Sequence, residues 1–208
     1  GQSLGAFLCQ GITLEVFGDA NDYVGKSLSG GTIIVRPTVS SPLDSQHNSI
    51  IGNTVLYGAT SGKLFAAGQA GERFAVRNSG AHVVVEGCGS NGLEYMTGGI
   101  AVILGKVGSN FGAGMTGGMA FVLDPEGSFA SNANPESIVW QRLESAHWEE
   151  QLKSLIMAHA HSTDSAWSRS IIDDWDRRRG EFWQICPKEM LTRLAYPLSD
   201  KATLEAAE

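Results

Sequence analysis

The stretch "GAGMTGG" at residues 112–118 decides between two folds for this chain. Its first six residues spell G-x-G-x-x-G, the fingerprint of a loop that holds the phosphates of a dinucleotide, and "GCGSNG" at residues 87–92 spells it again. A dinucleotide loop opens a helix, whereas these motifs run on into "GMAFVLD" and "LEYMTGG". We therefore interpret the glycines as corners that lead into strands, and we predict no phosphate site at either motif.

A Ser or Thr followed by Gly recurs through the first part of the chain. These pairs are Ser29-Gly30, Ser61-Gly62, Ser79-Gly80, Thr97-Gly98 and Thr116-Gly117. The last four are spaced by 18 or 19 residues, and Gln10-Gly11 precedes the first by 19. The one longer step holds "RPTVSSPLDSQHN" (residues 36–48), which we interpret as a loop-like insertion. A fixed period of this kind predicts a solenoid, here of six rungs.

Aligning the rungs on these glycines gives two wholly apolar columns. The third residue after the glycine is Leu14, Ile33, Phe65, Val83, Ala101 or Ala120, and the fifth is Val16, Val35, Ala67, Val85, Ile103 or Val122. Alternation within a rung marks one face of a strand, and recurrence in every rung means that the strands stack in parallel. We predict an all-β parallel solenoid with 18–19-residue rungs, filled by these columns and with the Ser/Thr residues stacked in register.

Glycine and tryptophan divide the chain near Asn134-Pro135. Of the 26 glycines, 25 lie in residues 1–127, whereas all five tryptophans lie beyond residue 135. We predict a β-helix domain at residues 1–134 and an α-helical C-terminal extension at residues 135–208 that packs on it. Asn134 and Pro135 suit the N-cap and first turn of a helix, and Ser162, Thr163 or Asp164 could cap a second helix that runs to about Trp183, before Pro187.

The outward positions of the last two rungs are unusually apolar. They are Ile100, Val102, Leu104, Met119, Phe121 and Leu123. The C-terminal extension offers a matching stripe at helical spacing, formed by Trp148, Leu152, Leu155 and Ile156. We predict that residues 135–185 cover this face and seal the last rung against further strand pairing.

Four stretches of the chain carry a resemblance to a known family. They are "GDANDYVGKSLSGG" (18–31), "GNTVLYGATSGKLFAAGQAGERFAVRNSGAHVVVEG" (52–87), "EYMTGG" (94–99) and "NFGAGMTGG" (110–118). Together they resemble the C-terminal GXGXG domain of the glutamate synthase large (alpha) subunit, over residues 1 to about 127. The resemblance implies a right-handed parallel β-helix with a structural role.

The parent that the resemblance implies is a cytoplasmic enzyme with FMN and a 3Fe-4S cluster. It converts L-glutamine, 2-oxoglutarate and reductant into two L-glutamates. Its amidotransferase and FMN-binding synthase domains lie upstream in the same polypeptide, and a small reductase subunit is a further possible partner. No position of this chain matches the catalytic, flavin or cluster motifs of those domains, so the resemblance implies no catalytic, cofactor-binding or metal residue here.

Two other functions remain open. A subunit of formylmethanofuran dehydrogenase shares a related β-helix, and some free-standing β-helix enzymes act on polysaccharides. The acid–base candidates for such chemistry are Glu15, Asp19, Asp22, Lys26, Glu72, Arg73 and Glu94. Catalysis would need paired groups within reach of one bond, whereas charges at solenoid turns are usually solvated. Stepping by six from Gly62 gives no aliphatic column, which argues against a hexapeptide-repeat acyltransferase.

The cysteines and histidines do not have the spacing of a metal-binding site. Cys9, Cys88 and Cys186 lie far apart, without a CxxC, so we expect free thiols in a reducing compartment. The histidines are His47, His82, His147, His159 and His161. His159 and His161 would point about 200° apart on a helix, where one zinc ion would not easily collect both.

Charge and hydropathy argue against two classes of partner, nucleic acid and membrane. The formal net charge is −7 without a basic block, which argues against nucleic acid. No apolar run approaches the roughly 18 residues of a membrane span. Because the chain lacks a signal peptide and an initiating methionine, we expect it to be a piece of a longer protein.

Overall fold

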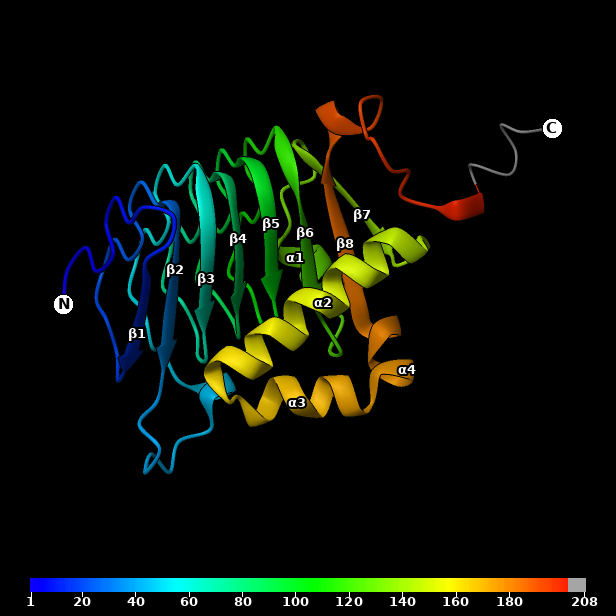
Figure 1. The fold of residues 1–208 in the computed structure, drawn as a ribbon. Helices are drawn as coiled ribbons and strands as arrows, with labels where there is room; N and C mark the ends of the chain where they lie inside the picture. The colour runs from blue at the N-terminus through cyan, green and yellow to red at the C-terminus, as the bar shows by residue number, and fades with distance from the viewer. Residues whose placement is uncertain (202–208) are drawn as a thin grey trace.

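Six coils of a parallel β-solenoid form the body of the protein (Figure 1). The computed structural model describes residues 1–201. Each coil contributes one strand to a single sheet, in which neighbouring strands of the sequence pair in parallel. These strands are β1 (Thr13–Phe17), β2 (Ser29–Arg36), β3 (Ser61–Ala66), β4 (Ser79–Val85), β5 (Thr97–Ile103) and β6 (Gly117–Leu123). The predicted fold of the first part of the chain is thus confirmed.

Two apolar columns fill the interior of the solenoid, but the predicted register is wrong at β3. The ladder places Leu64 rather than Phe65 in the first column, and Ala66 rather than Ala67 in the second. The shift arises because β3 is one residue shorter than the other strands at its start: Gly62 precedes Leu64 by two residues, whereas Gly30 precedes Ile33 by three. Phe65 therefore packs on the outer face of the sheet.

The Ser/Thr column does not form a straight ladder. Ser29 lies opposite Ser61 as predicted. In the later coils, however, a hydroxyl residue lies opposite a glycine: Ser79 opposite Gly98, and Thr97 opposite Gly117. The predicted register is wrong there, because irregularities at the start of these strands shift the pairing by one residue.

The recurring glycine lets the backbones of neighbouring coils approach closely. A Cβ atom on Gly117 would lie 2.0 Å from the carbonyl oxygen of Thr97, and one on Gly98 would lie 2.2 Å from that of Ser79. Backbone atoms of a paired strand cannot move aside as a flexible side chain can. Close approach of the coils therefore explains the glycine at these two positions.

Before each strand, the coil passes through three alternating residues with left-handed backbone conformation. The non-glycine examples before β2 to β5 are Tyr23, Ser27, Thr54, Leu56, Arg73, Ala75, Arg77, Asn91, Leu93 and Tyr95. The middle residue of each trio points inward, as buried Leu56 and Leu93 show. The outer two donate backbone hydrogen bonds to the next coil, for example from Arg77 N–H to the Glu94 carbonyl at 3.0 Å. These bonds offset the cost of left-handed conformation in residues other than glycine.

The insertion at residues 36–48 is a loop outside the regular coils, as predicted. It follows β2 and contains the short 3-10 helix η1 (Ser45–His47). Its most exposed apolar side chain is that of Val39, which is 90% exposed. The loop and the turn between two C-terminal helices enclose a hollow of about 400 Å³, whose lining includes Arg36 and Trp167.

The C-terminal part of the chain is not purely helical, and the predicted helix start at Asn134-Pro135 is wrong. Residues that follow this pair form strand β7 (Ile138–Arg142), which pairs antiparallel with β8 (Phe182–Pro187). β8 also pairs antiparallel with β6, so the sheet runs in the order β1-β2-β3-β4-β5-β6-β8-β7. The last coil is therefore sealed by strands of the same chain.

The helices of this part begin later than predicted. They are α1 (Phe129–Asn132), α2 (Ala146–Thr163), α3 (Ala166–Asp173) and α4 (Trp175–Arg178), with 3-10 helices η2 (Arg179–Glu181) and η3 (Lys188–Met190). Ser145 is the N-cap of α2. Ser165, one residue beyond the predicted caps, is the N-cap of α3 and accepts a hydrogen bond from the Ser168 N–H at 3.2 Å. None of these helices is long and apolar enough to span a membrane.

Two apolar cores lie on either side of the sheet. The inner core fills the coils and is closed at one end by Phe129, Ile138 and Ile185. The outer core lies between the sheet and helix α2, which crosses its outer face, and helix α3, which packs beside α2 near the ends of the strands (Figure 1). Its members include Val102, Leu104, Met119, Phe121, Leu123, Leu152, Leu155 and Ile156. The predicted cover of this face is thus confirmed, while the division into domains at residues 1–134 and 135–208 stays a prediction.

Candidate functional site

The charged residues considered for acid–base chemistry form structural ion pairs or lie apart. The Glu15 carboxylate on β1 is 3.5 Å from the Nε of Arg36 on β2. Glu94 and Arg73, also on neighbouring coils, pair at 3.3 Å. The other candidates are spread over the segments before β2 and β4: Asp19, Asp22, Lys26 and Glu72. This arrangement joins acids to bases of the next coil, which stabilises a surface rather than building a catalytic pair.

The two glycine-rich motifs do not fit the phosphates of a dinucleotide or a flavin nucleotide. In "GAGMTGG", the Gly112 N–H donates to the Gly92 carbonyl at 2.9 Å, and the Gly114 N–H donates to Ser137 Oγ at 2.8 Å. In "GCGSNG", the Gly89 N–H donates to a carbonyl of the preceding coil at 3.0 Å. A phosphate cradle needs free N–H groups that point at the ligand, and here these donors serve contacts between coils.

The three cysteines do not fit an iron–sulfur cluster. Cys9 is exposed, whereas Cys88 and Cys186 are buried in the inner and outer core respectively. Burial raises the pKa of the Cys88 thiol to about 12 and that of Cys186 to about 11. Cluster ligands are thiolates brought together around iron, so neither the positions nor the protonation of these side chains suits that chemistry.

Histidines do not gather into a metal site. Among residues 1–201, no group of three or more His, Cys, Asp or Glu side chains could hold a metal ion. His82 on β4 has its pKa lowered by burial and by the nearby charge of Lys63. His161 is exposed, whereas His159 on α2 is completely buried.

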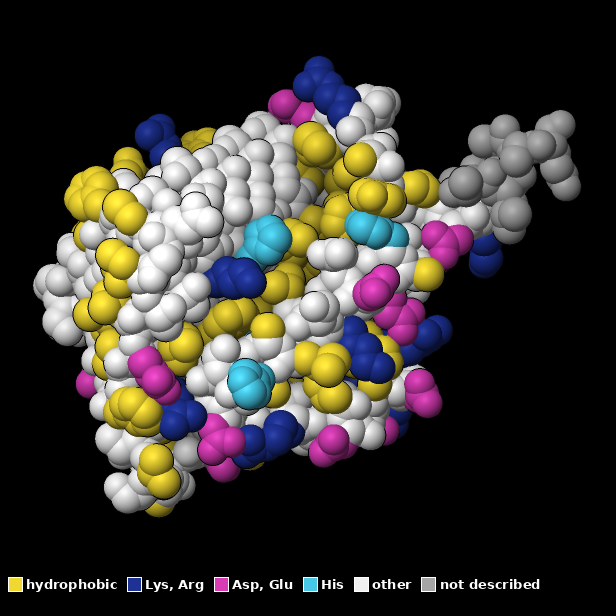
Figure 2. Space-filling view, in the orientation of Figure 1, with side chains coloured by type: hydrophobic (Ala, Val, Ile, Leu, Met, Phe, Trp, Pro, Cys, Tyr) yellow, Lys and Arg dark blue, Asp and Glu magenta, His cyan; other side chains and the backbone are white. Residues whose placement is uncertain are grey.

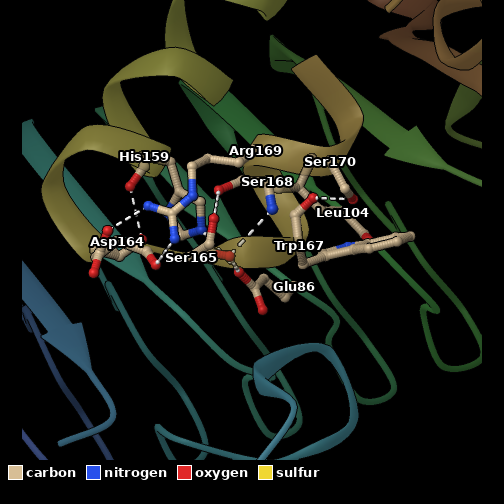
Figure 3. Close-up of polar contacts among 10 residues, drawn as sticks. Glu86, Leu104, His159, Asp164, Ser165, Trp167, Ser168, Arg169 and Ser170 are labelled. Carbon is tan, nitrogen blue, oxygen red and sulfur yellow. Dashed lines mark hydrogen bonds and ion pairs between the residues drawn. The ribbon is translucent and has the colours of Figure 1, made fainter. Parts of the chain in front are cut away.

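Glu86, His159 and Ser165 form a buried polar cluster that the sequence analysis missed (Figure 3). His159 Nε2 is 3.1 Å from Glu86 Oε1, and Ser165 Oγ donates to the same carboxylate oxygen at 2.5 Å. The side chains of the Glu86–His159 pair are both 0% exposed. Glu86 Oε2 and His159 Nδ1 have no hydrogen-bond partner among the described residues. The cluster joins the end of β4 to α2 and to the start of α3, so it fixes both helices on the solenoid.

Asp124, at the corner after β6, is a second buried polar residue that connects several elements. One carboxylate oxygen accepts from the Ser128 N–H at 2.9 Å, and the other accepts from the Phe129 N–H and the Trp183 Nε1 at 3.0 Å each. Burial alone would raise the pKa of Asp124. The hydrogen bonds donated by Phe129, Trp183 and Ser128 outweigh this effect and hold the pKa below its usual value. Asp124 thus ties β8 and α1 to the last coil.

Replacing Asp124 with Asn should lower the free energy of unfolding by about 1–3 kcal/mol at pH 7, because one acceptor oxygen becomes a donor. Since the pKa is lowered in the folded state, the wild-type carboxylate stabilises the fold above the unfolded pKa of about 3.9. That contribution is lost as the pH falls through and below this value, so the difference in unfolding free energy between wild type and variant should shrink there.

Urea unfolding of both proteins at pH 7 and in acid tests this prediction. Glu126→Gln, at an exposed ion pair with Lys106, is the control, and a difference independent of pH would contradict the prediction.

The first coil presents an uncovered apolar end of the solenoid among the described residues. Among residues 1–201, β1 is an edge strand that pairs only with β2. Around it Phe7, Ile12 and Phe17 are 64%, 48% and 50% exposed. Figure 2 shows hydrophobic side chains gathered at this end of the molecule. We call β1 with these three side chains the first-coil end. An uncovered strand edge flanked by apolar side chains is suited to contact with another protein surface.

Comparisons with known proteins agree with this geometry. The family described as "GXGXG motif" matches residues 1–188. The NADPH glutamate synthase large chain of Azospirillum brasilense is 68% identical over 198 residues, which are 95% of this chain and 13% of that protein. The NADH glutamate synthase of Schizosaccharomyces pombe is 51% identical over 91% of this chain and 9% of its own length. A chloroplastic ferredoxin-dependent glutamate synthase of Arabidopsis thaliana is 49% identical over 90% of this chain and 12% of its own.

Proposed function

This chain belongs to the GXGXG motif family and matches the C-terminal region of the glutamate synthase large chain; on that premise, we propose that it is a non-catalytic structural and interaction region of such an enzyme. The whole enzyme would convert L-glutamine, 2-oxoglutarate and reductant into two L-glutamates. The chemistry would belong to amidotransferase and FMN-binding domains elsewhere in the polypeptide, which would also hold the 3Fe-4S cluster. This chain would hold those domains in place.

The observation that carries this proposal is the uneven covering of the solenoid. The outer sheet face is covered by α2 and α3, and the last coil is closed by β8 and β7, all from the same chain. The first-coil end has no such cover among the described residues. Solenoids need capping at both ends, so the first-coil end is the natural place for the rest of a large polypeptide to dock.

The polar groups of the chain support a structural role as well. The ion pairs of Glu15 and Glu94 link neighbouring coils, and the glycine motifs use their N–H groups for contacts between coils. Two buried carboxylates, those of Glu86 and Asp124, attach the C-terminal elements to the sheet. The identities to glutamate synthases favour this function over a formylmethanofuran dehydrogenase subunit or a polysaccharide-acting enzyme.

Replacing Ile12 with Asp should weaken the contact between this region and the rest of the full-length enzyme, because a carboxylate would enter an apolar contact at the first-coil end. Ile12 is half exposed in this chain, so the change should leave the fold of the region itself intact. We expect lower glutamine-dependent glutamate formation and faster proteolysis between this region and its neighbours. Val39→Asp, on the exposed insertion, is the matched control. If both variants behave as the wild type, the first-coil end is not an interface.

A further inference from the structure

We propose that a second face of the solenoid binds an acidic segment from the preceding part of the same polypeptide. We call it the turn face, and it consists of Tyr23, Lys26, Tyr57, Arg73, Arg77 and Tyr95 on successive coils. This inference rests on the proposed function, since it names a second contact and the chemistry of its partner.

The turn face has the composition of a binding surface. Tyr23 and Tyr95 are 39% and 52% exposed, and the side chain of Arg73 is 50% exposed. Tyrosine and arginine are the residues that most often dominate protein–protein binding energy, because they combine large contact areas with directed polar groups. The exposed tyrosine and arginine side chains of the turn face therefore fit contact with another protein surface.

A hollow in this face offers a cation and hydroxyl groups to a carboxylate. It has a volume of about 510 Å³ and is lined by Ser3, Tyr23, Lys26, Thr54, Tyr57 and Arg73. The Lys26 ammonium lies 5.8 Å above the Tyr23 ring. Within residues 1–201, Arg73 has an ion-pair partner in Glu94, but Lys26 and Arg77 have none. An acidic side chain in this hollow would pair with the ammonium and accept hydrogen bonds from hydroxyl groups.

The backbone beneath the turn face is fixed before any partner binds. Arg77 and Tyr95 are both left-handed residues whose N–H groups donate to the next coil, at 3.0 and 2.9 Å. Gly114 lies directly under Tyr95, so close that a Cβ atom there would be 2.4 Å from the ring. A preorganised surface loses little conformational entropy on binding.

The relatives indicate which polypeptide would fill this surface. The chain corresponds to the C-terminal region of proteins of which it spans 13% or less, so most of their length precedes the matched region. Ser3 lines the hollow, so the preceding chain would enter the solenoid beside the turn face. The part of the molecule most able to reach the hollow is therefore a segment upstream of residue 1.

Hydroxyl-radical footprinting of the full-length enzyme tests the proposal with an internal control. Tyr95 and Tyr196 have the same chemistry and nearly the same exposure in this chain, 52% and 51%, but Tyr196 lies near the C-terminal end, stacked on His147. If the turn face is occupied, Tyr95 should be oxidised several-fold more slowly than Tyr196. Equal rates would overturn the proposal.

Charge reversal tests the chemistry of the partner. Lys26→Glu combined with Arg77→Glu should repel an acidic segment and raise the oxidation rate of Tyr95 toward that of Tyr196, whereas Arg193→Glu should leave it unchanged. Protection of Tyr95 that survives the double reversal would overturn the acidic partner. Failure here is distinct from failure of the proposed function, because the Ile12→Asp variant probes the first-coil end and does not involve the turn face.

Discussion

Replacing Gly117 with valine is expected to abolish the native fold. The new Cβ atom would lie 2.0 Å from the carbonyl oxygen of Thr97 and 2.7 Å from its carbonyl carbon. Both atoms belong to the backbone of β5, which pairs with β6 at this point. Relief of the clash requires the last two coils to separate, and this would also disturb β8, which pairs with β6. We expect a loss of at least about 3 kcal/mol in the free energy of unfolding.

Gly180→Val is the matched control for this substitution. The substitution is chemically the same, but a Cβ atom at Gly180 would meet nothing within 4 Å. Neither glycine has the positive φ that side chains avoid, so the comparison isolates the close approach of the coils. Soluble expression and urea unfolding followed by circular dichroism give the measurement. Similar unfolding curves for the two variants would show that the coils can yield at Gly117.

Replacing Glu86 with alanine is expected to destabilise the chain by about 3–5 kcal/mol, the usual cost of breaking a buried pair. The substitution leaves His159 Nε2 and Ser165 Oγ without their acceptor in a site that water does not reach. It also opens a cavity between β4 and the two helices. Because the cluster fixes α2 and α3, we expect these helices to become susceptible to protease before the solenoid unfolds.

Three comparisons separate the polar contact from the loss of volume. Glu94→Ala removes a partly exposed carboxylate paired with Arg73, and it should cost under about 1 kcal/mol. A double-mutant cycle of Glu86→Ala and His159→Ala should give a coupling energy of about 1–3 kcal/mol. Additive effects would mean that the Glu86–His159 contact does not hold the helices. The variant Glu86→Leu with His159→Leu should recover part of the stability, because apolar pairs often replace buried ion pairs without loss.

The sequence by itself determined the repeating part of this protein. A coil of 18 or 19 residues repeats its glycine corner and apolar alternation locally, so spacing alone predicted the parallel strands and the inner core. It also predicted that the apolar outward positions of the last two rungs would be covered, because such a face is rarely left bare. The register at β3 was predicted wrongly because alignment on the recurring glycine assumed equal spacing in every coil, whereas β3 is one residue shorter between Gly62 and Leu64.

Only the tertiary structure decided how the C-terminal part closes the solenoid. "FWQICP" became β8 because it pairs with the free edge of β6, some 60 residues away, and "IVWQR" became β7 because it pairs with β8. This pairing outweighed the local helix signal at Asn134-Pro135. The Glu86–His159 contact joins residues 73 positions apart, and neither residue stands in a motif. Partners this distant leave no local pattern, because their meeting depends on where the packed helices come to lie on the sheet.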